Sequence, residues 1–169
     1  VVSLALVRLH QGRWAEAAEL AGSVLCLPAA SADAPHEFGL PVYIRVIGLV
    51  ALGRVQTRRG DPEAAATLDE ALALASTGGA FHRRGHVHAA RAEAAWLSGD
   101  HVRAAAEART VLDAAVHHGS RWNIGELYVW LMRSGKPDRP PDGVDLPEPH
   151  LRALAGDWAA AAVAWDALE

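Results

Sequence analysis

Three histidines that lie close together in the sequence are the first residues that could do chemistry. His82 and His86 are one helical turn apart, and His88 follows two residues later. Imidazoles at a spacing of four residues fall on one face of a helix and can bind a metal such as zinc. A zinc site needs further ligands, and no cysteine pair or HExxH pattern stands beside them. The sequence therefore favours ordinary surface or groove histidines, and we expect neither a metal nor a cofactor.

Three aspartates and one cysteine are the other candidates for catalysis. Asp61, Asp100 and Asp157 each follow a glycine at the start of an expected helix, where an aspartate caps the first backbone N–H groups. Cys26 has no basic neighbour to lower the pKa of its thiol, which favours a buried structural cysteine. The only lysine, Lys136, does not lie in a phosphate-binding glycine motif. The sequence therefore predicts that the chain is not an enzyme.

Composition restricts the class of protein. The 169 residues are 51% hydrophobic and 21% charged, and the net charge is −4. This balance excludes extensive disorder, and it argues against a surface that binds nucleic acid or an anionic membrane. A single cysteine excludes an internal disulfide framework, and we expect a reducing cytoplasm. Since the chain starts without methionine inside an apolar helical pattern, we expect a fragment of a longer polypeptide.

Helices are the elements that must position these residues. They repeat in pairs, and the two helices of a pair are joined at a glycine, which we call a corner. Between Gly53 and Gly119 a pattern of glycine, aspartate, alanines and a leucine-rich tail occurs twice. The apolar spacing follows a helical period, without strand-like alternation. We expect helices over residues 1–11, 14–25, 42–59, 62–76, 81–97, 101–118, 122–133, 150–155 and 158–168. Loops are expected at 28–35 and at the glycine pair 78–79, and a proline-rich loop at 136–149, all within a single domain, 1–169.

The corner glycines give the repeat a common frame. They are Gly12, Gly60, Gly99 and Gly156, and the fifth residue after each is an alanine: Ala17, Ala65, Ala104 and Ala161. A small residue there lets the second helix of a pair approach the first. The ninth residue fits less well in the second pair, where Asp69 occupies an apolar position. Ala64, Leu68 and Ala71 restore the apolar face if that corner is one residue shorter.

Two stretches carry a family likeness. The segment LGRVQTRRGDPEAAATLDEAL, with Gly53 and Gly60 at its glycine positions, resembles a tetratricopeptide repeat. The tail GELYVWLMRSG…PEPHLRALAGDWAAAAVAWDALE resembles the last helical repeats of large LuxR-type ATPase regulators. The resemblance implies an all-α fold, in which helix-turn-helix pairs stack as a short right-handed solenoid. It also implies an ATPase before this segment and a DNA-binding helix-turn-helix after it, so this fragment would not itself bind DNA.

The repeat frame of that family also implies a concave face built from the first helix of each pair. The candidate binding residues on it are Arg54, Arg58, His86, Glu93, Trp96, Trp122 and Arg133. Arginines favour an acidic or carboxylate partner. We expect Arg54 and Arg58 to be exposed, so that replacing both with alanine weakens binding and leaves stability unchanged. The alternative is that Trp96, Trp122 and Met132 fill the core between repeats. Trp14 and Trp158, at the same place after a corner glycine, are expected to be structural wedges.

Two functions are compatible with these observations. The first is a protein-interaction or effector-sensing scaffold in a multidomain transcriptional regulator. Its partner would be a peptide or another domain of the same polypeptide, or a small effector. The second is a structural spacer or oligomerisation module, for example in a homodimer, without a ligand of its own.

Overall fold

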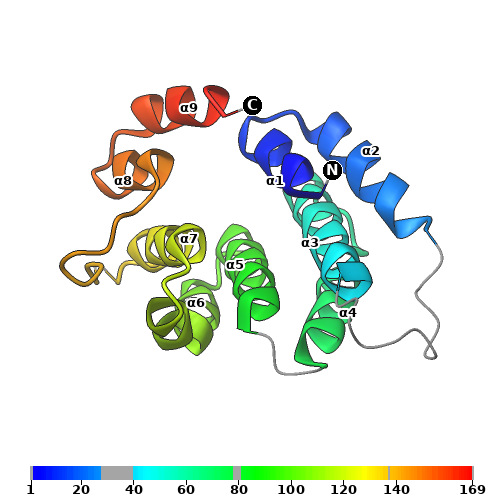
Figure 1. Cartoon of the computed structure of the whole chain (residues 1–169), viewed down its shortest axis with the longest axis horizontal. Helices are drawn as coiled ribbons and strands as arrows, with labels where there is room; N and C mark the ends of the chain where they lie inside the picture. The colour runs from blue at the N-terminus through cyan, green and yellow to red at the C-terminus, as the bar shows by residue number, and fades with distance from the viewer. Residues whose placement is uncertain (1, 28–39, 78–80, 137, 169) are drawn as a thin grey trace.

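A computed structural model of the chain describes residues 2–27, 40–77, 81–136 and 138–168. These residues form nine helices and no strand (Figure 1). The helices are α1 (Val2–His10), α2 (Trp14–Leu25), α3 (Leu40–Arg59), α4 (Ala64–Ser76), α5 (Phe81–Leu97), α6 (His101–His117), α7 (Arg121–Arg133), α8 (Glu148–Leu154) and α9 (Trp158–Asp166). The prediction of an all-α fold is confirmed, and the expected helix ends differ by one or two residues.

The helices form a curved row whose two ends meet. Helices α1, α3, α5 and α7 line its inner side, and α2, α4 and α6 lie outside them (Figure 1). Consecutive helices pack on each other, and α9 at the end of the chain contacts α1 at its beginning. This succession of helix pairs fits the predicted stack of repeats. We call α1, α3, α5 and α7 the inner helices.

The glycine corners share one backbone geometry. At Gly99, φ is +84°, a conformation that side chains rarely adopt. The Asp100 N–H donates to the Ala95 carbonyl at 2.9 Å, which is the hydrogen bond of a Schellman helix end. The Asp100 carboxylate then accepts from the Arg103 N–H at 2.9 Å and caps α6. Asp157 caps α9 in the same way, so the capping prediction is confirmed at both corners.

The second corner differs, as its sequence suggested. Asp61 accepts a hydrogen bond from the Glu63 N–H at 2.9 Å, but α4 begins at Ala64 and not at Pro62. The predicted close contact at Ala65 is wrong, because Ala65 is exposed. Leu68 faces α3 instead: a Cβ on Gly53 would lie 2.6 Å from the Leu68 Cδ2. Glycine is therefore required for α3 and α4 to pack this closely.

In the other three pairs the small residue is buried as expected: Ala17, Ala104 and Ala161 are 0%, 0% and 5% exposed. The prediction for Cys26 is wrong, because this free cysteine is exposed at the end of α2. The expected loops at 28–35 and at 78–79 lie outside the described residues. Among the described helices, none combines the length and the hydropathy that a membrane span requires.

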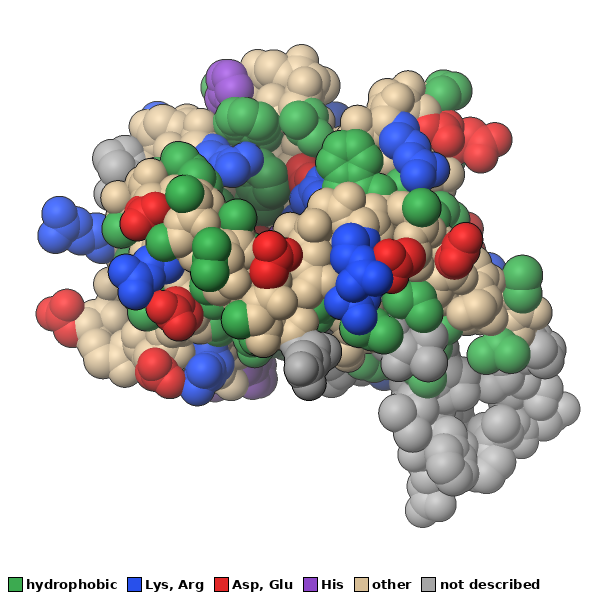
Figure 2. All heavy atoms as spheres, turned by 90° about the horizontal axis from the view of Figure 1, so that it is seen from above, with side chains coloured by type: hydrophobic (Ala, Val, Ile, Leu, Met, Phe, Trp, Pro, Cys, Tyr) green, Lys and Arg blue, Asp and Glu red, His purple; other side chains and the backbone are tan. Residues whose placement is uncertain are grey.

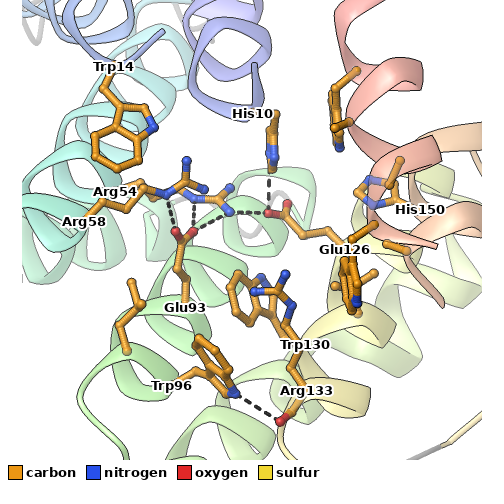
Figure 3. Close-up of a pocket in the computed structure, with 17 residues that line it drawn as sticks. His10, Trp14, Arg54, Arg58, Glu93, Trp96, Glu126, Trp130, Arg133 and His150 are labelled. Carbon is orange, nitrogen blue, oxygen red and sulfur yellow. Dashed lines mark hydrogen bonds and ion pairs between the residues drawn. The ribbon is translucent and has the colours of Figure 1, made fainter. Parts of the chain in front are cut away.

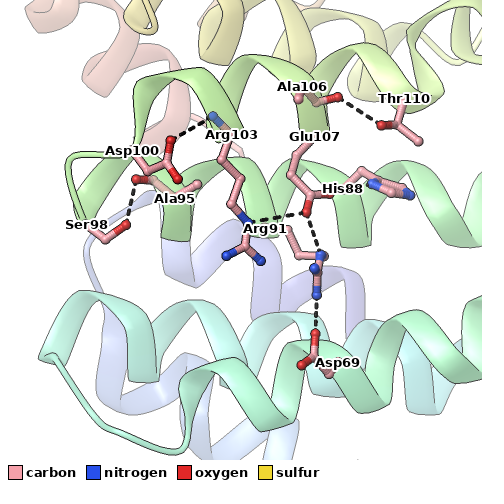
Figure 4. A network of polar contacts seen from close by, with 10 residues as sticks. All are labelled: Asp69, His88, Arg91, Ala95, Ser98, Asp100, Arg103, Ala106, Glu107 and Thr110. Carbon is pink, nitrogen blue, oxygen red and sulfur yellow. Dashed lines mark hydrogen bonds and ion pairs between the residues drawn. The ribbon is translucent and has the colours of Figure 1, made fainter.

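On the outer side, an ion-pair network joins three helices (Figure 4). Arg91 on α5 pairs with Asp69 on α4, and its Nε donates to Glu107 Oε1 on α6 at 2.9 Å. The other Glu107 oxygen lies 2.8 Å from His88 Nδ1. We call these four residues the outer network. Asp69, which broke the apolar pattern in the sequence, thus has a role between helices.

Candidate functional site

The inner helices enclose two cavities, one at each end. The first has a volume of about 510 Å³ and lies at the carboxyl-terminal halves of α3, α5 and α7, where Arg58, Trp96 and Arg133 line it. The second, of about 470 Å³, lies at their amino-terminal halves, beside His86 and Trp122. Figure 2 shows a hollow bordered by hydrophobic side chains, with basic and acidic side chains inside. Because α3, α5 and α7 run in the same direction, corresponding helix ends meet in one cavity.

All six tryptophans of the chain line these two cavities. They come from four helices and are Trp14, Trp96, Trp122, Trp130, Trp158 and Trp165. Trp14 and Trp158, the expected structural wedges, are 36% and 44% exposed, and both line the first cavity. Trp122 is 41% exposed, so it does not simply fill the core between repeats. This concentration of aromatic surface is the main feature of the site.

A buried ion-pair network lies in the wall of the first cavity (Figure 3), and its residues Arg54 and Glu126 also line the second. Arg54 on α3 donates to Glu93 on α5 through Nε at 2.6 Å, and its Nη2 lies 2.6 Å from Glu126 Oε1 on α7. Arg58, one turn after Arg54, donates to the other Glu93 oxygen at 2.5 Å and to the Leu9 carbonyl at 2.9 Å. We call Arg54, Arg58, Glu93 and Glu126 the inner network. It joins three successive helix pairs through their first helices.

Burial sets the electrostatics of the inner network. Burial alone would lower the pKa of Arg54, but Glu126 and Glu93 reverse this effect and raise it. Burial likewise acts to raise the pKa of Glu93, and Arg54 and Arg58 outweigh it and lower the pKa. Both side chains are therefore charged at neutral pH. Each stabilises the charge of the other in a place that water hardly reaches.

One expectation about this face is wrong. Arg54 is only 1% exposed and Arg58 is partly buried, and both are already paired with carboxylates of the same chain. They are not free to bind an acidic partner in the way that the sequence suggested. Replacing both would leave Glu93 buried without a partner, which destabilises a protein strongly. In place of unchanged stability, we therefore expect that double variant to be less stable than wild type.

An aromatic cluster closes the row of helices where its ends meet. Trp165 on α9 stacks on His10 of α1, with centroids 4.0 Å apart and planes at 6°. His150 on α8 and Trp122 on α7 lie 5.4 and 5.6 Å from Trp165. The Gln11 side chain donates to the Trp165 carbonyl at 3.1 Å and to the Leu168 carbonyl at 3.0 Å. These contacts make a closed arc out of what would otherwise be an open groove.

Both histidines of this cluster are neutral at physiological pH. Burial, reinforced by Arg54 and Arg58, holds the pKa of His10 well below its ordinary value. Burial also lowers the pKa of His150, to about 4, with Glu126 opposing the shift and Arg54 adding to it. The contact of 3.8 Å between His10 and Glu126 is therefore not an ion pair at neutral pH. The positive charge at the centre comes from the arginines.

Arg133, at the end of α7, occupies the mouth of the first cavity. Its guanidinium carbon lies 5.3 Å from the ring centroid of Trp96, 5.2 Å from that of Trp130 and 4.5 Å from that of Trp158. The Trp96 indole N–H donates to the Arg133 carbonyl at 3.0 Å. Guanidinium groups are attracted to the negative faces of such rings. The three tryptophans thus hold the Arg133 side chain in place.

The predicted residues divide between the two cavities. Five of them line the first cavity: Arg54, Arg58, Glu93, Trp96 and Arg133. His86 and Trp122 line the second cavity, which Arg54 also touches. Sequence reasoning missed Glu126 because the repeat frame did not place it on the concave face. It also missed His10, since the repeat frame was not extended to the first helix.

The described residues contain no group of three or more histidine, cysteine or acidic side chains that could hold a metal ion. The side chain of His82, from the histidine cluster of the sequence, lies outside the described part. Comparison with protein-family models, with curated proteins and with solved structures gives no match to this chain. No relative therefore indicates a function for the site. Its geometry suits reversible binding of a molecule against tryptophan faces.

Proposed function

We propose that this chain is a helical-repeat module that binds a small effector between its inner helices. The observation that carries the proposal is the gathering of all six tryptophans around two cavities. Ligand sites are concave, largely apolar and aromatic, with a few placed polar groups, and typically measure about 300–1,000 Å³. The first cavity, at about 510 Å³, fits this description. A spacer module has no need for such a surface.

The closed arc favours a small molecule over an extended peptide. A peptide that follows a repeat groove needs a concave face that is open along its length. Here the contacts of Gln11 and His10 with α9 close the groove, and residues of the inner network line both cavities. Each cavity accommodates a compact ligand. A ligand bound there would contact several helix pairs, because α1, α3, α7 and α9 all contribute to the walls.

We further propose that the module is the sensor segment of a cytoplasmic transcriptional regulator with several domains. This part of the proposal rests on the likeness of the repeats and of the tail from Gly125 onward to LuxR-type ATPase regulators. Other segments of such a protein would hydrolyse ATP and bind DNA. The module would pass the binding event to a neighbouring domain of the same polypeptide.

The proposal is tested by a search for compounds that stabilise the protein. A variant whose first cavity is blocked serves as the comparison. Ala162 is exposed on α9 and lines the first cavity, so Ala162→Phe would fill it without disturbing the core. Ala159, exposed on the same helix and not part of the cavity wall, gives the matched control Ala159→Phe. Compounds that raise the melting temperature are collected from a metabolite library, and their affinity is measured by calorimetry.

We expect compounds that bind wild type and Ala159→Phe equally well and bind Ala162→Phe at least about tenfold more weakly. They should also change the tryptophan fluorescence, since every tryptophan lies in a cavity wall. Hits that bind Ala162→Phe as tightly as wild type would contradict the proposal. A library without any hit would favour the spacer function.

A further inference from the structure

The first cavity contains an excess of positive charge. Three arginines and two glutamates line it, Arg54, Arg58, Arg133, Glu93 and Glu126, which gives a net charge of 3 − 2 = +1. The histidines add no charge at neutral pH, because the pKa values of both are lowered. Arg54 and Arg58 are matched by the two glutamates. The excess charge is therefore that of Arg133.

Within the described residues, the Arg133 guanidinium forms no ion pair and donates no side-chain hydrogen bond. Its neighbours are the aromatic rings of Trp96, Trp130 and Trp158. Aromatic rings attract the cation but accept few of its N–H groups, so its five donors remain available. Partial burial also lowers the pKa of Arg133, with Glu93 opposing this shift. An anion at this point would complete its coordination.

A second donor in the same wall has no acceptor. The indole N–H of Trp130 is buried, and no described residue accepts a hydrogen bond from it. Trp130 is 6% exposed and lies three residues before Arg133 on α7. Native proteins rarely leave a buried donor without an acceptor, and such a group deserves an explanation. Trp130 also lines the first cavity, so both donors without an acceptor among the described residues belong to side chains of its wall.

We propose that the first cavity binds a small organic acid, with its carboxylate held by the guanidinium of Arg133 and its flat apolar body against the tryptophans. The inference deepens the proposed function and rests on it. Arginine presents a planar fork of donors that matches the two oxygens of a carboxylate. The rings of Trp14, Trp96 and Trp158 offer the apolar surface that the rest of the molecule needs.

A cationic ligand is the alternative for these tryptophans, since aromatic rings bind ammonium groups. Here that place is already taken, because the Arg133 guanidinium lies 4.5 Å from the Trp158 centroid. A second cation would be repelled by Arg133 and by Arg58. A neutral molecule would bind the apolar walls but would leave Arg133 without an anion. Of an acid, a cation and a neutral molecule, the charges of the first cavity therefore favour the acid.

The experiment compares three probes with one aromatic body and different charge: naphthylacetate, naphthylacetamide and naphthylethylammonium. Their affinities are measured by calorimetry on wild type, Arg133→Met and Arg109→Met. Methionine keeps an apolar side chain against the tryptophans and removes the charge. Arg109 is an exposed arginine on α6 that pairs with Asp138 outside the cavity, so Arg109→Met is the matched control. Circular dichroism melting confirms that each variant is folded.

For wild type and Arg109→Met we expect naphthylacetate to bind more than about tenfold more tightly than naphthylacetamide, as for a hydrogen bond to a charged group. In Arg133→Met this preference should fall to within about threefold. Arg133→Lys, which keeps the charge and loses the planar fork, should retain part of it. Naphthylethylammonium should bind most weakly to wild type.

Three outcomes overturn the inference, and they can be distinguished. If amide and acetate bind wild type equally, and Ala162→Phe abolishes both, the effector cavity stands and the preference for an acid is wrong. The same holds if Arg133→Met keeps the full preference. If none of the three probes binds wild type, the inference is wrong, and the proposed function loses support with it.

Discussion

Two arginine networks join helices in this protein, and they differ in how far water reaches them. The inner network links α3, α5 and α7 through Arg54, whose side chain is 2% exposed, with Glu93 at 3% and Glu126 at 9%. The outer network links α4, α5 and α6 through Arg91, with 14% exposure, and Glu107, with 13%. Its third member, Asp69, is 68% exposed. Similar chemistry is thus used in two very different environments.

The difference shows what burial does to an ion pair. A charge that is removed from water is costly unless a partner compensates it, so a buried pair is strongly interdependent. An exposed pair is screened by solvent and contributes little to stability. The inner network therefore specifies how the first helices of three pairs face each other. The outer network supports helices whose packing is already determined by closely packed alanines.

The largest effect is expected from removing the central cation. Arg54→Ala leaves Glu93 and Glu126 buried without their shared partner and should lower the free energy of unfolding by about 3–5 kcal/mol. Urea denaturation at neutral pH measures this change. Replacing all four residues of the inner network with apolar ones of similar size should recover most of the loss, because no charge of the network then remains buried. An Arg54→Ala variant as stable as wild type would mean that the two networks do not differ.

The next effect concerns close packing in the outer layer. Ala104 is completely buried on α6, so Ala104→Leu should destabilise the fold by about 1–3 kcal/mol through overpacking. Ala65 occupies the same repeat position on α4 but is exposed. Ala65→Leu should therefore change stability by less than about 0.5 kcal/mol. Thermal melting of the two variants side by side checks the difference, and equal melting temperatures would refute the assigned packing.

The closed arc next to the inner network should respond to acid. The pKa of His150 is about 4 in the fold against an ordinary 6.5, so between these values the unfolded chain binds more protons. Stability is then complete above pH 6.5 and falls as the pH falls toward 4. His150 alone should account for a loss of about 2 kcal/mol between about pH 7 and about pH 5.

The matched variant is His150→Phe, which keeps an aromatic ring between Trp122 and Trp165 and cannot take up a proton. His10, whose pKa is lowered as well, and the carboxylates titrate in both proteins, so the difference between the two isolates His150. Urea denaturation at the two pH values supplies the data. An equal loss of stability in both proteins would show that His150 does not titrate as expected.

The smallest effect is expected at the exposed edge of the outer network. Asp69→Ala removes one partner of Arg91, but Glu107 remains paired with it, and Asp69 is mostly in water. The free energy of unfolding should change by less than about 0.5 kcal/mol, and added salt should shrink the change further. Thermal melting at low and high salt measures both. A loss comparable to that of Arg54→Ala would remove the distinction between the two networks.

Much of the fold follows from the sequence because it depends on local chemistry. A glycine with positive φ and an aspartate cap fix two of the corners within a few residues, so Asp100 and Asp157 could be identified as caps. The irregular second pair was also visible, since Ala64 and Leu68 restored the apolar face. Cys26 could not be placed, because one residue at a helix end carries no periodicity.

The site was only partly predictable because its contacts join distant parts of the chain. The repeat frame brought Arg54, Glu93 and Arg133 to one face, and they do line one cavity. It did not reveal that Arg54 is buried, since this depends on Glu126, a residue from another repeat. Nor could it show that α9 returns to α1. No local pattern encodes how strongly a row of helices curves.

The Gln11 hydrogen bonds, which span 154 and 157 residues, bear on how this protein folds. In a linear repeat array each unit contacts only its neighbours, and the terminal units fray first. Here α1 and α9 hold each other, so each is secured by a contact far away in the sequence. Such long-range contacts form late, because the intervening chain must first be ordered. We therefore expect folding to proceed locally and to end with this closure. Amide hydrogen exchange should then be slowed equally at α1 and α9 and accelerated together in Gln11→Ala.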